Sequence, residues 1–279
     1  MSRTISTSMR GFAVFLAAML SACAGGGVNV ATTPAPLSRA EIDALLASPD
    51  RSDADRRNDV RRKPAEMLEF IGVRPGMVAL DLSAGGGYTT ELLARAAGPT
   101  GTVYGQSRPP SPSPAGAVAP QGDAAPAAAP RRTTPMALAE RAKKPAAANI
   151  VSVVQSLESP APAERATAGL DLVTLMYNYH ELGYLPVDRA RMNAAVFRAL
   201  KPGGAYVVAD HAGRPGTGIS EAATLHRVEE EFLRREVEAA GFRLAAEGLF
   251  LRNRADPRDR ETPDPPRTKD EFVLRFVKP

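Results

Sequence analysis

The sequence contains no tryptophan and only one cysteine, and aromatic residues make up 5% of its 279 residues. A single cysteine excludes an intramolecular disulfide and a zinc site built from several cysteines. Basic residues exceed acidic ones by four (35 against 31), an excess too small to indicate a nucleic-acid-binding protein. With so few aromatic side chains, the core must be built mainly from leucine, valine, alanine and phenylalanine.

The sequence also lacks a hydrophobic run long enough to cross a bilayer as a helix. Its uncharged N-terminal run, Gly11 to Leu20, is ten residues long, whereas the hydrocarbon core is about 30 Å thick. This run follows Arg3 and Arg10 and is typical of a secretory signal peptide. The next residues, Leu20-Ser-Ala-Cys23, resemble the lipobox of bacterial lipoproteins, which implies cleavage before Cys23 and acylation of that cysteine.

We therefore expect a signal peptide over residues 1–22 and a lipidated tether over residues 23–36. Removal of the first 22 residues would leave 257 residues with a net charge of +2, because two basic residues leave with the peptide. The expected location is the periplasm-facing cell envelope, with the outer membrane favoured over the inner one. Two alternatives stay open: an ordinary signal peptide in which Cys23 has no role, and a cytosolic protein whose first residues are not a working signal.

Beyond residue 36 the sequence predicts one domain, over residues 37–279, in which strands alternate with helices. Ser38-Arg-Ala-Glu41 is a capping box that starts a first helix, and Pro64 suits the first turn of a second helix ending near Ile71. The strands that we expect are 78–82, 102–106, 149–154, 170–177, 205–210, 244–251 and 272–277, and the later helices are 89–97, 136–148, 187–200 and 220–240.

This alternation predicts an α/β fold with a doubly wound, mostly parallel seven-stranded sheet and a helical N-terminal cap. The last two strands have no helix between them, so we expect an antiparallel edge strand. A tract rich in proline and alanine, about residues 107–131, predicts a disordered insertion within the domain. In such sheets ligands bind beyond the carboxyl ends of the strands, so we expect the site residues there.

Residues 50–63 combine four aspartates with six basic side chains. The simpler interpretation is a solvated helix face with ion pairs along it. The alternative is a basic flap that covers an anionic ligand.

The first expected strand leads into a glycine-rich turn, Asp81-Leu-Ser-Ala-Gly-Gly-Gly87. Such a turn lets backbone N–H groups approach a ligand closely. The pattern does not fit a nicotinamide dinucleotide site, because the third glycine of G-x-G-x-x-G is replaced by Thr90 and the second strand ends in Gln106.

Asp81-x-Ser83-x-Gly85-x-Gly87 resembles the D-x-G-x-G-x-G motif of class I S-adenosylmethionine-dependent methyltransferases, with serine for the first glycine. Three further segments resemble that family in the same order: Leu172 to Leu182, the segment Leu200-Lys-Pro-Gly-Gly before a strand, and Ala239-Ala-Gly-Phe242. The whole pattern resembles a bacterial group of predicted methyltransferases. It implies a Rossmann-like methyltransferase fold and S-adenosylmethionine as cofactor.

The resemblance also assigns roles to single residues. Ser83, Gly85 and Gly87 would line the methionine part of the cofactor, and Asp81 would fix the turn or the amino group. Gln106 would face the ribose hydroxyls, where the family usually has an acid, and Ser156 and Leu157 would lie near the adenine. The missing acids weaken the match to the cofactor, because a carboxylate is the stronger acceptor.

All three histidines lie at or after expected strand ends. We predict that His180, His211 and Asp210 are catalytic, and that Asn178 and Tyr179 bind substrate. His226 is a further candidate, and each histidine has a structural alternative as a capping or carboxylate-pairing residue. A metal site formed by these residues with Glu181 and Glu230 is a weaker alternative, and we predict no metal.

The leading hypothesis is an enzyme that transfers a methyl group from S-adenosylmethionine to a small molecule or an envelope component. The alternative is a lipid-anchored binding module that has this fold without catalysis. We predict a small-molecule partner and a membrane contact through the lipid anchor, and no nucleic-acid partner, because no aromatic and basic patch is present.

Overall fold

The computed structural model describes Met1 and residues 34–110, 133–261 and 268–279. Residues 34–279 form one compact unit. The predicted signal peptide apart from Met1, Cys23 with most of its tether, and the predicted insertion apart from its first four residues lie outside the described residues. Within the described part of the chain, no helix is long and apolar enough to cross a membrane.

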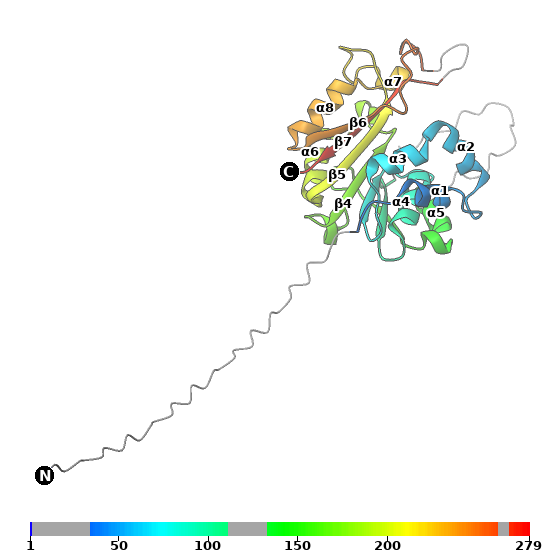
Figure 1. Cartoon of the computed structure of the whole chain (residues 1–279). Helices are drawn as coiled ribbons and strands as arrows, with labels where there is room; N and C mark the ends of the chain where they lie inside the picture. Colours follow the sequence, from blue (N-terminus) through cyan, green and yellow to red (C-terminus); the bar gives the residue numbers. More distant parts are fainter. Residues whose placement is uncertain (2–33, 111–132, 262–267) are drawn as a thin grey trace. The chain divides into compact units, whose positions relative to one another are not determined.

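A seven-stranded sheet forms the centre of the unit, as predicted (Figure 1). The strand order is β3-β2-β1-β4-β5-β7-β6, and every pairing from β3 to β5 is parallel. The bounds are β1 Val78–Leu82, β2 Thr102–Ser107, β3 Ile150–Val154, β4 Leu170–Met176, β5 Leu200–His211, β6 Arg243–Gly248 and β7 Glu271–Val277. The order reverses at β1 and β4, so a ligand site is expected at the carboxyl ends of these two strands.

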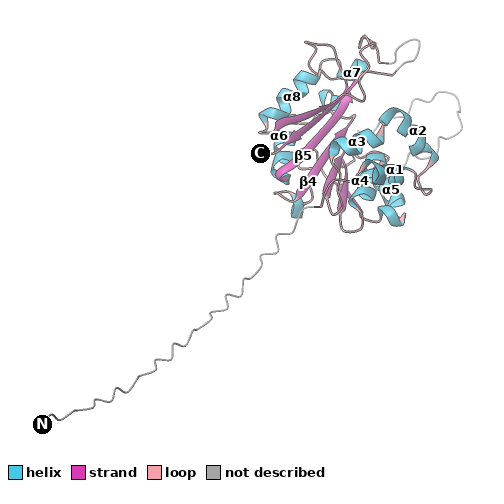
Figure 2. Ribbon diagram, in the orientation of Figure 1, coloured by secondary structure: helices cyan, strands magenta, loops and turns pink. Residues whose placement is uncertain are grey.

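Helices cover both faces of the sheet (Figure 2). On one face lie α1 (Arg39–Leu46), α3 (Pro64–Ile71), α4 (Tyr88–Ala97) and α5 (Thr134–Arg141). On the other face lie α6 (Arg189–Ala199) and α8 (Glu230–Ala239). The remaining helical segments are α2 (Asp53–Arg62), α7 (Ala222–Leu225) and three short 3₁₀ turns, η1 (Pro145–Ala147), η2 (Ala163–Arg165) and η3 (His180–Gly183).

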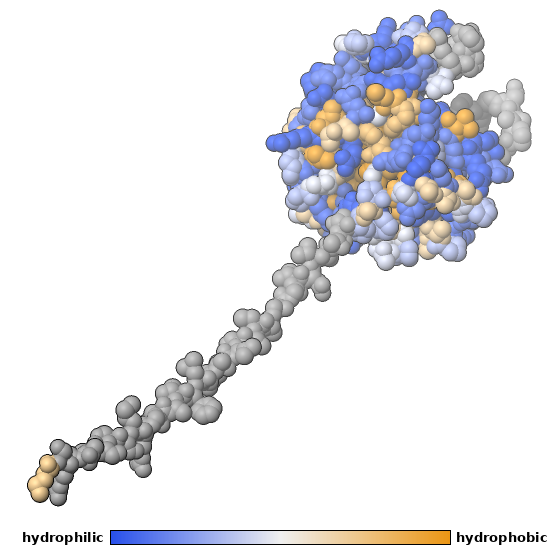
Figure 3. All heavy atoms as spheres, viewed as in Figure 1, coloured by the Kyte–Doolittle hydropathy of each residue, from blue (hydrophilic) through white to orange (hydrophobic). Residues whose placement is uncertain are grey.

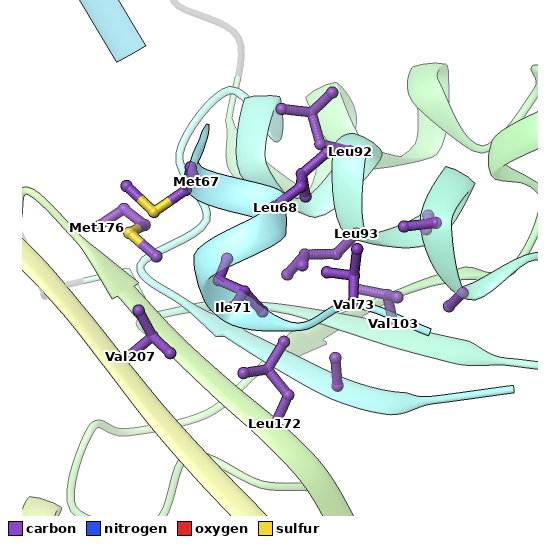
Figure 4. Close-up of a cluster of buried hydrophobic side chains, with 14 of the residues drawn as sticks. Met67, Leu68, Ile71, Val73, Leu92, Leu93, Val103, Leu172, Met176 and Val207 are labelled. Carbon is purple, nitrogen blue, oxygen red and sulfur yellow. The ribbon is translucent and has the colours of Figure 1, made fainter. Parts of the chain in front are cut away.

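Alternation along the strands divides the core into two clusters. Along β5, Val207 packs toward the α3 and α4 side, whereas Tyr206 and Val208 pack toward α6 and α8. Figure 4 shows the first cluster, in which Leu68 and Ile71 of α3 lie among side chains of α4 and of the strands. In the space-filling view the apolar side chains gather where β5 and α3 lie, and the surface over α8 is mostly hydrophilic (Figure 3).

Local sequence signals set several helix starts as predicted. The Ser38 side chain accepts from the Glu41 backbone N–H, and the Glu41 carboxylate accepts in return from the Ser38 backbone, which completes the capping box. Pro64 stands at the start of α3, where its missing N–H costs no helical hydrogen bond. These caps fix the starts of α1 and α3, whose apolar side chains share one core cluster with α4.

The expected place of the antiparallel strand and the expected length of one helix are both wrong. The antiparallel strand is not at the edge, because β7 is inserted between β5 and β6 and pairs antiparallel with both. The helix expected over 136–148 ends at Arg141, and only a 3₁₀ turn follows.

The long helix expected over 220–240 is in fact two helices, α7 and α8, separated by residues 226–229. His226 adopts a left-handed φ of 51° there, and Arg227 is fully buried in an ion pair with Asp256, 2.9 Å away. Val228 forms a bridge to Ala212 beside β5. The amphipathic spacing of apolar residues continues across positions 226–229, so the sequence pattern shows no break there. The helix is interrupted by the tertiary contacts of this segment with Ala212 and Asp256.

Candidate functional site

The glycine turn between β1 and α4 holds three residues with positive φ: Ser83 (50°), Gly85 (54°) and Gly87 (76°). Gly87 precedes the first turn of α4, and a Cβ there would lie 2.7 Å from Leu138 of α5. The N–H groups of Gly85 and Gly86 have no hydrogen-bond partner among the described residues, and both glycines are exposed. The turn therefore offers two free backbone donors at a helix N-terminus, an arrangement that binds carboxylates and phosphates.

Asp81 holds the turn from inside the sheet. One of its oxygens accepts from the Thr90 hydroxyl at 2.6 Å and the other from the Thr174 hydroxyl at 2.8 Å. Only 2% of the residue is exposed. Burial raises the pKa of the Asp81 carboxyl to about 6, although the two threonines oppose this. Asp81 therefore joins β1 to α4 and β4 on either side of the glycine turn.

The raised pKa of Asp81 has a consequence for stability. The folded chain retains this proton up to about pH 6, whereas the unfolded chain loses it near 3.8, so this carboxyl lowers the stability as pH rises from about 4 to 6. Asp81→Asn removes that titration and should gain stability relative to the parent chain across this interval, by about 3 kcal/mol at most. Urea unfolding of both chains at pH 4, 5, 6 and 7 measures their free energies of unfolding. A difference between the two chains that does not change with pH would contradict a raised pKa of Asp81.

Gln106 is not free to face a ligand. Its side-chain carbonyl accepts from the Ser83 N–H at 2.9 Å, and its amide nitrogen donates to the Gln155 carbonyl at 2.6 Å. The residue is fully buried. The structure therefore makes Gln106 a brace between the glycine turn and the end of β3, and not the predicted acceptor for ribose hydroxyls. The next residue, Ser107, has a buried hydroxyl without a hydrogen-bond partner.

An open cavity of about 390 Å³ lies at these strand ends. Ser83 and Gly85 of the glycine turn form one wall, and Ser107 lines it from the end of β2. Asn178, one of the two predicted substrate contacts, lines it from the segment after β4. Glu181 also lines it, and Arg108, Pro109, Pro110 and Thr134 complete the lining. The volume lies within the range of small-molecule sites in proteins.

Next to this cavity, β4 and β5 bring His180 and Asp210 together. Nδ1 of His180 lies 2.6 Å from Oδ1 of Asp210, and the backbone N–H of His180 donates to Oδ2 at 2.8 Å. The Asp210 carboxylate also accepts from the His211 N–H at 2.8 Å. Because a carboxylate only accepts, Nδ1 of His180 carries the proton, and Nε2 keeps a free lone pair. This is the arrangement of an oriented general base.

Two more histidine rings pack against His180. The ring of His211 lies 5.7 Å from it and that of His226 lies 5.6 Å from it, measured between centroids. Burial lowers the pKa of His211, although the Glu271 carboxylate, 3.1 Å from its Nδ1, acts in the opposite direction. All three histidines thus share one face at the ends of β4 and β5, as their positions after strand ends predicted.

Tyr177, the first residue after β4, is strained. Its φ is 62°, a conformation that costs an aromatic residue roughly 1–3 kcal/mol and that concentrates at functional sites. The ring lies 5.5 Å from that of His211. After this left-handed turn, Asn178 lines the cavity, whereas Tyr179 packs in the core cluster on the side of α6 and α8.

Of the predicted site residues, Ser83, Gly85 and Asn178 line the cavity, and three others lie away from both the cavity and the His180–Asp210 pair. Tyr179 is fully buried, and its hydroxyl donates to Glu236 at 2.8 Å, so it is a core residue and not a substrate contact. Leu157 is buried in the cluster under α6 and α8. Ser156 is exposed and does not line the cavity. Across the described ranges, no group of three or more histidine, cysteine or acidic residues is placed to hold a metal ion.

A buried ionic network supports the glycine turn from behind, and no pattern in the sequence indicated it. Glu91 of α4 accepts from Arg95, Arg141 and Lys144, with the Lys144 nitrogen 2.9 Å from each of its oxygens. Arg141 also pairs with Asp55 of α2 and donates from Nε to the Gly86 carbonyl at 2.6 Å. The network therefore connects α2, α4 and α5 to the turn.

No protein-family model and no curated protein matches this sequence. Solved structures match it at the level of fold. A SAM-dependent methyltransferase from Aquifex aeolicus is 18% identical with a TM-score of 0.51, and the match covers 86% of this chain and 98% of that one. A candidate sarcosine dimethylglycine methyltransferase from Galdieria sulphuraria is 15% identical with a TM-score of 0.52, covering 87% and 92%.

An arsenic(III) S-adenosylmethionine methyltransferase from Chlamydomonas reinhardtii is 17% identical with a TM-score of 0.50, covering 88% of this chain and 75% of its own. The strand order and the helices on both faces account for these matches. The chain therefore has the fold of S-adenosylmethionine-dependent methyltransferases.

Proposed function

We propose that this protein binds S-adenosylmethionine at the carboxyl ends of β1, β2 and β4 and transfers its methyl group to an acceptor held beside His180. The observation that carries the proposal is the joint position of three features. These are the exposed glycine turn, the cavity of about 390 Å³ beside it and the His180–Asp210 pair at the next strand ends.

The residues around the cavity fit this cofactor in part. The free N–H groups of Gly85 and Gly86 suit the methionine carboxylate. The unpartnered hydroxyl of Ser107 suits a ribose hydroxyl, in place of the carboxylate that the family usually has at the end of β2. Since a neutral hydroxyl is a weaker partner than a carboxylate, we expect weaker cofactor binding than an acid at this position would give.

The bound cofactor would supply an electrophilic methyl group. The chain itself supplies position and a proton acceptor. Asp210 fixes the ring of His180, and Nε2 of His180 takes the proton that a hydroxyl, amine or carbon acid loses on methylation. Asn178 holds the turn after β4 by donating from its side-chain amide to the Met176 carbonyl at 2.8 Å.

Calorimetric titration of the protein with S-adenosylmethionine and S-adenosylhomocysteine tests the proposal. Binding with micromolar affinity supports it and leads to a screen for acceptors. Absence of binding at millimolar ligand removes the methyltransferase proposal and leaves the fold unchanged.

Gly85→Ala should weaken S-adenosylhomocysteine binding about tenfold or more. Gly85 has a φ of 54°, which costs alanine roughly 1–2 kcal/mol, and its Cα lines the cavity, so the new methyl group changes the turn that the ligand contacts. Gly72→Ala is the matched control, because Gly72 also has a positive φ (73°), its Cβ would meet no atom within 4 Å, and it lies at the end of α3 outside the cavity lining. Calorimetric titration of both variants with S-adenosylhomocysteine measures the two affinities. Equal affinities would place the ligand away from this turn.

A binding module without catalysis is the second candidate, and one observation favours it. Gln106, at the position of the family's ribose-binding acid, is fully buried and hydrogen-bonded to the backbone of Ser83 and Gln155. A protein that binds S-adenosylhomocysteine but gives no methylated product with any acceptor would be such a module.

We further propose that the protein is lipid-anchored at Cys23 and faces the periplasm. The proposal rests on the Leu20-Ser-Ala-Cys23 segment and the apolar run before it. Mass spectrometry of the N-terminus of the native protein tests it. An acylated Cys23 supports the anchor, whereas an intact Met1 would support the cytosolic alternative.

A further inference from the structure

One edge of the sheet has free backbone groups along its whole length. β3 is the outermost strand at this edge, and β2 is its neighbour on the other side. The Asn149 carbonyl and the Gln155 N–H both bond to β2, so the odd-numbered residues face that strand. The even-numbered residues, Ile150, Ser152 and Val154, turn their N–H and C=O groups outward. Among the described residues these outward groups have no hydrogen-bond partner.

The side chains of β3 do not discourage pairing with a further strand. From Asn149 to Ser156 the sequence has no charged residue and no proline, and the register of β3 with β2 is unbroken. Val151 is 41% exposed and Val154 is 47% exposed, although both are large apolar residues. Proteins usually block an edge strand with a charge, a proline or a bulge. Because β3 has none of these, its edge is open to another strand.

The opposite edge of the same sheet is blocked. There β6 carries Arg243 and Glu247, both exposed, near its two ends. Its register with β7 also shifts between Leu244 and Ala246. Charges and an irregular register are common means of preventing strand pairing at an edge. The contrast between the two edges indicates that β3 has a partner in solution.

We infer that β3 is an interface between two copies of this chain, in which the two β3 strands pair antiparallel about a twofold axis at Ser152. Ile150 of one copy then lies opposite Val154 of the other, and Ser152 lies opposite its own copy. In this register all three residues exchange backbone hydrogen bonds across the axis. On the other face Val151 meets Val153, so the side-chain pairs are apolar and no like charges meet.

This self-complementarity favours a second copy over other occupants of the edge. An identical strand satisfies every outward backbone group, and a twofold contact closes at two copies. The tract at residues 111–132 of the same chain is a poor strand partner by composition. It has five prolines, which cannot donate to a ladder, and the residues between them are mostly alanine, glycine and serine.

Sedimentation velocity of the full chain over about 1–200 µM tests the inference. The first variant is Ser152→Lys, which puts two like charges on the axis at an exposed position. The matched control is Ala245→Lys, which adds the same charge at an exposed position of β6. Urea unfolding of each variant checks the fold. Because Ile150–Val154 do not line the cavity, the test is independent of the proposed function.

The parent chain should dimerise with a Kd below about 100 µM, and Ser152→Lys should raise that Kd about tenfold or more. Ala245→Lys should dimerise as the parent does. A parent that stays monomeric at the highest concentration, assemblies of more than two copies, or an equal change of Kd in the two variants would each overturn the inference.

Hydrogen exchange of the parent chain gives a second readout that needs no variant. The amides of Ile150, Ser152 and Val154 should exchange rapidly at the lowest concentration and become protected at the highest. Protection of these amides in a monomer would show that another part of the same chain covers the edge. Rapid exchange of all three in a dimer would place the contact elsewhere. Either result would overturn the inference.

Discussion

Glu91→Gln should lower the free energy of unfolding by about 3 kcal/mol or more, which corresponds to a fall in Tm of roughly 6–12 °C for a chain of this size. Only 2% of the Glu91 side chain is exposed, and three cations converge on it. Glutamine keeps the shape but removes the charge, so Arg95, Arg141 and Lys144 would be left with two partner aspartates, Asp50 and Asp55.

The pH dependence gives this prediction a second check. Burial raises the pKa of Glu91, but the bonds from Lys144, Arg141 and Arg95 outweigh it and hold the pKa below its ordinary value of 4.5. The stabilisation by Glu91 is therefore complete above about pH 4.5 and is lost as pH falls through its lower folded value. Urea unfolding should show the difference between parent and variant shrinking in acid.

Glu69→Gln is the matched control for Glu91. Glu69 pairs with Arg39 at 3.1 Å, but both side chains are nearly half exposed, so its loss should cost less than about 1 kcal/mol. Equal losses in the two variants would show that the network around Glu91 contributes no more than a surface pair. Because Arg141 also donates to the Gly86 carbonyl, we expect Glu91→Gln to weaken S-adenosylhomocysteine binding as well.

The sheet was predictable from the sequence because its strands carry the signal themselves. Val78–Leu82 and Leu170–Met176 are short apolar runs bounded by polar turns, and such runs are buried wherever they pair. The place of β7 was not predictable. Strand order depends on contacts between residues such as His211 and Glu271, 60 positions apart, and no local pattern encodes them.

The candidate site was predictable at the level of strand ends and not at the level of side-chain direction. The positions of His180 just after β4 and of Asp210 at the end of β5, two neighbouring parallel strands, brought the two residues together as expected. The left-handed turn at Tyr177, by contrast, decides that Asn178 lines the cavity while Tyr179 enters the core. A single backbone angle of this kind leaves no trace in residue types. Gln106 was misjudged for a similar reason, since its partners lie on the backbone of two other segments.

Once an acceptor is in hand, His180→Asn should lower kcat for methyl transfer by about 10²–10⁴ while leaving the affinity for S-adenosylhomocysteine unchanged. Asparagine can place an amide N–H where Nδ1 of His180 stands, so it can keep the bond to Asp210 that is 2.6 Å long in the parent chain. It has no atom at the position of Nε2. The variant therefore removes the proton acceptor with little change to the packing around it.

The size of the loss in kcat distinguishes a catalytic role of the His180–Asp210 pair from a structural one. If Nε2 of His180 accepts the proton of the acceptor, the variant loses its rate while the unfolding midpoint changes little. If His180 only supports the fold, His180→Asn should change the unfolding midpoint and leave kcat and its pH profile as they were. Steady-state release of S-adenosylhomocysteine between pH 5 and 9, measured beside urea unfolding of the same samples, distinguishes the two. An unchanged profile would move the base to His211 or show that the acceptor reacts without one.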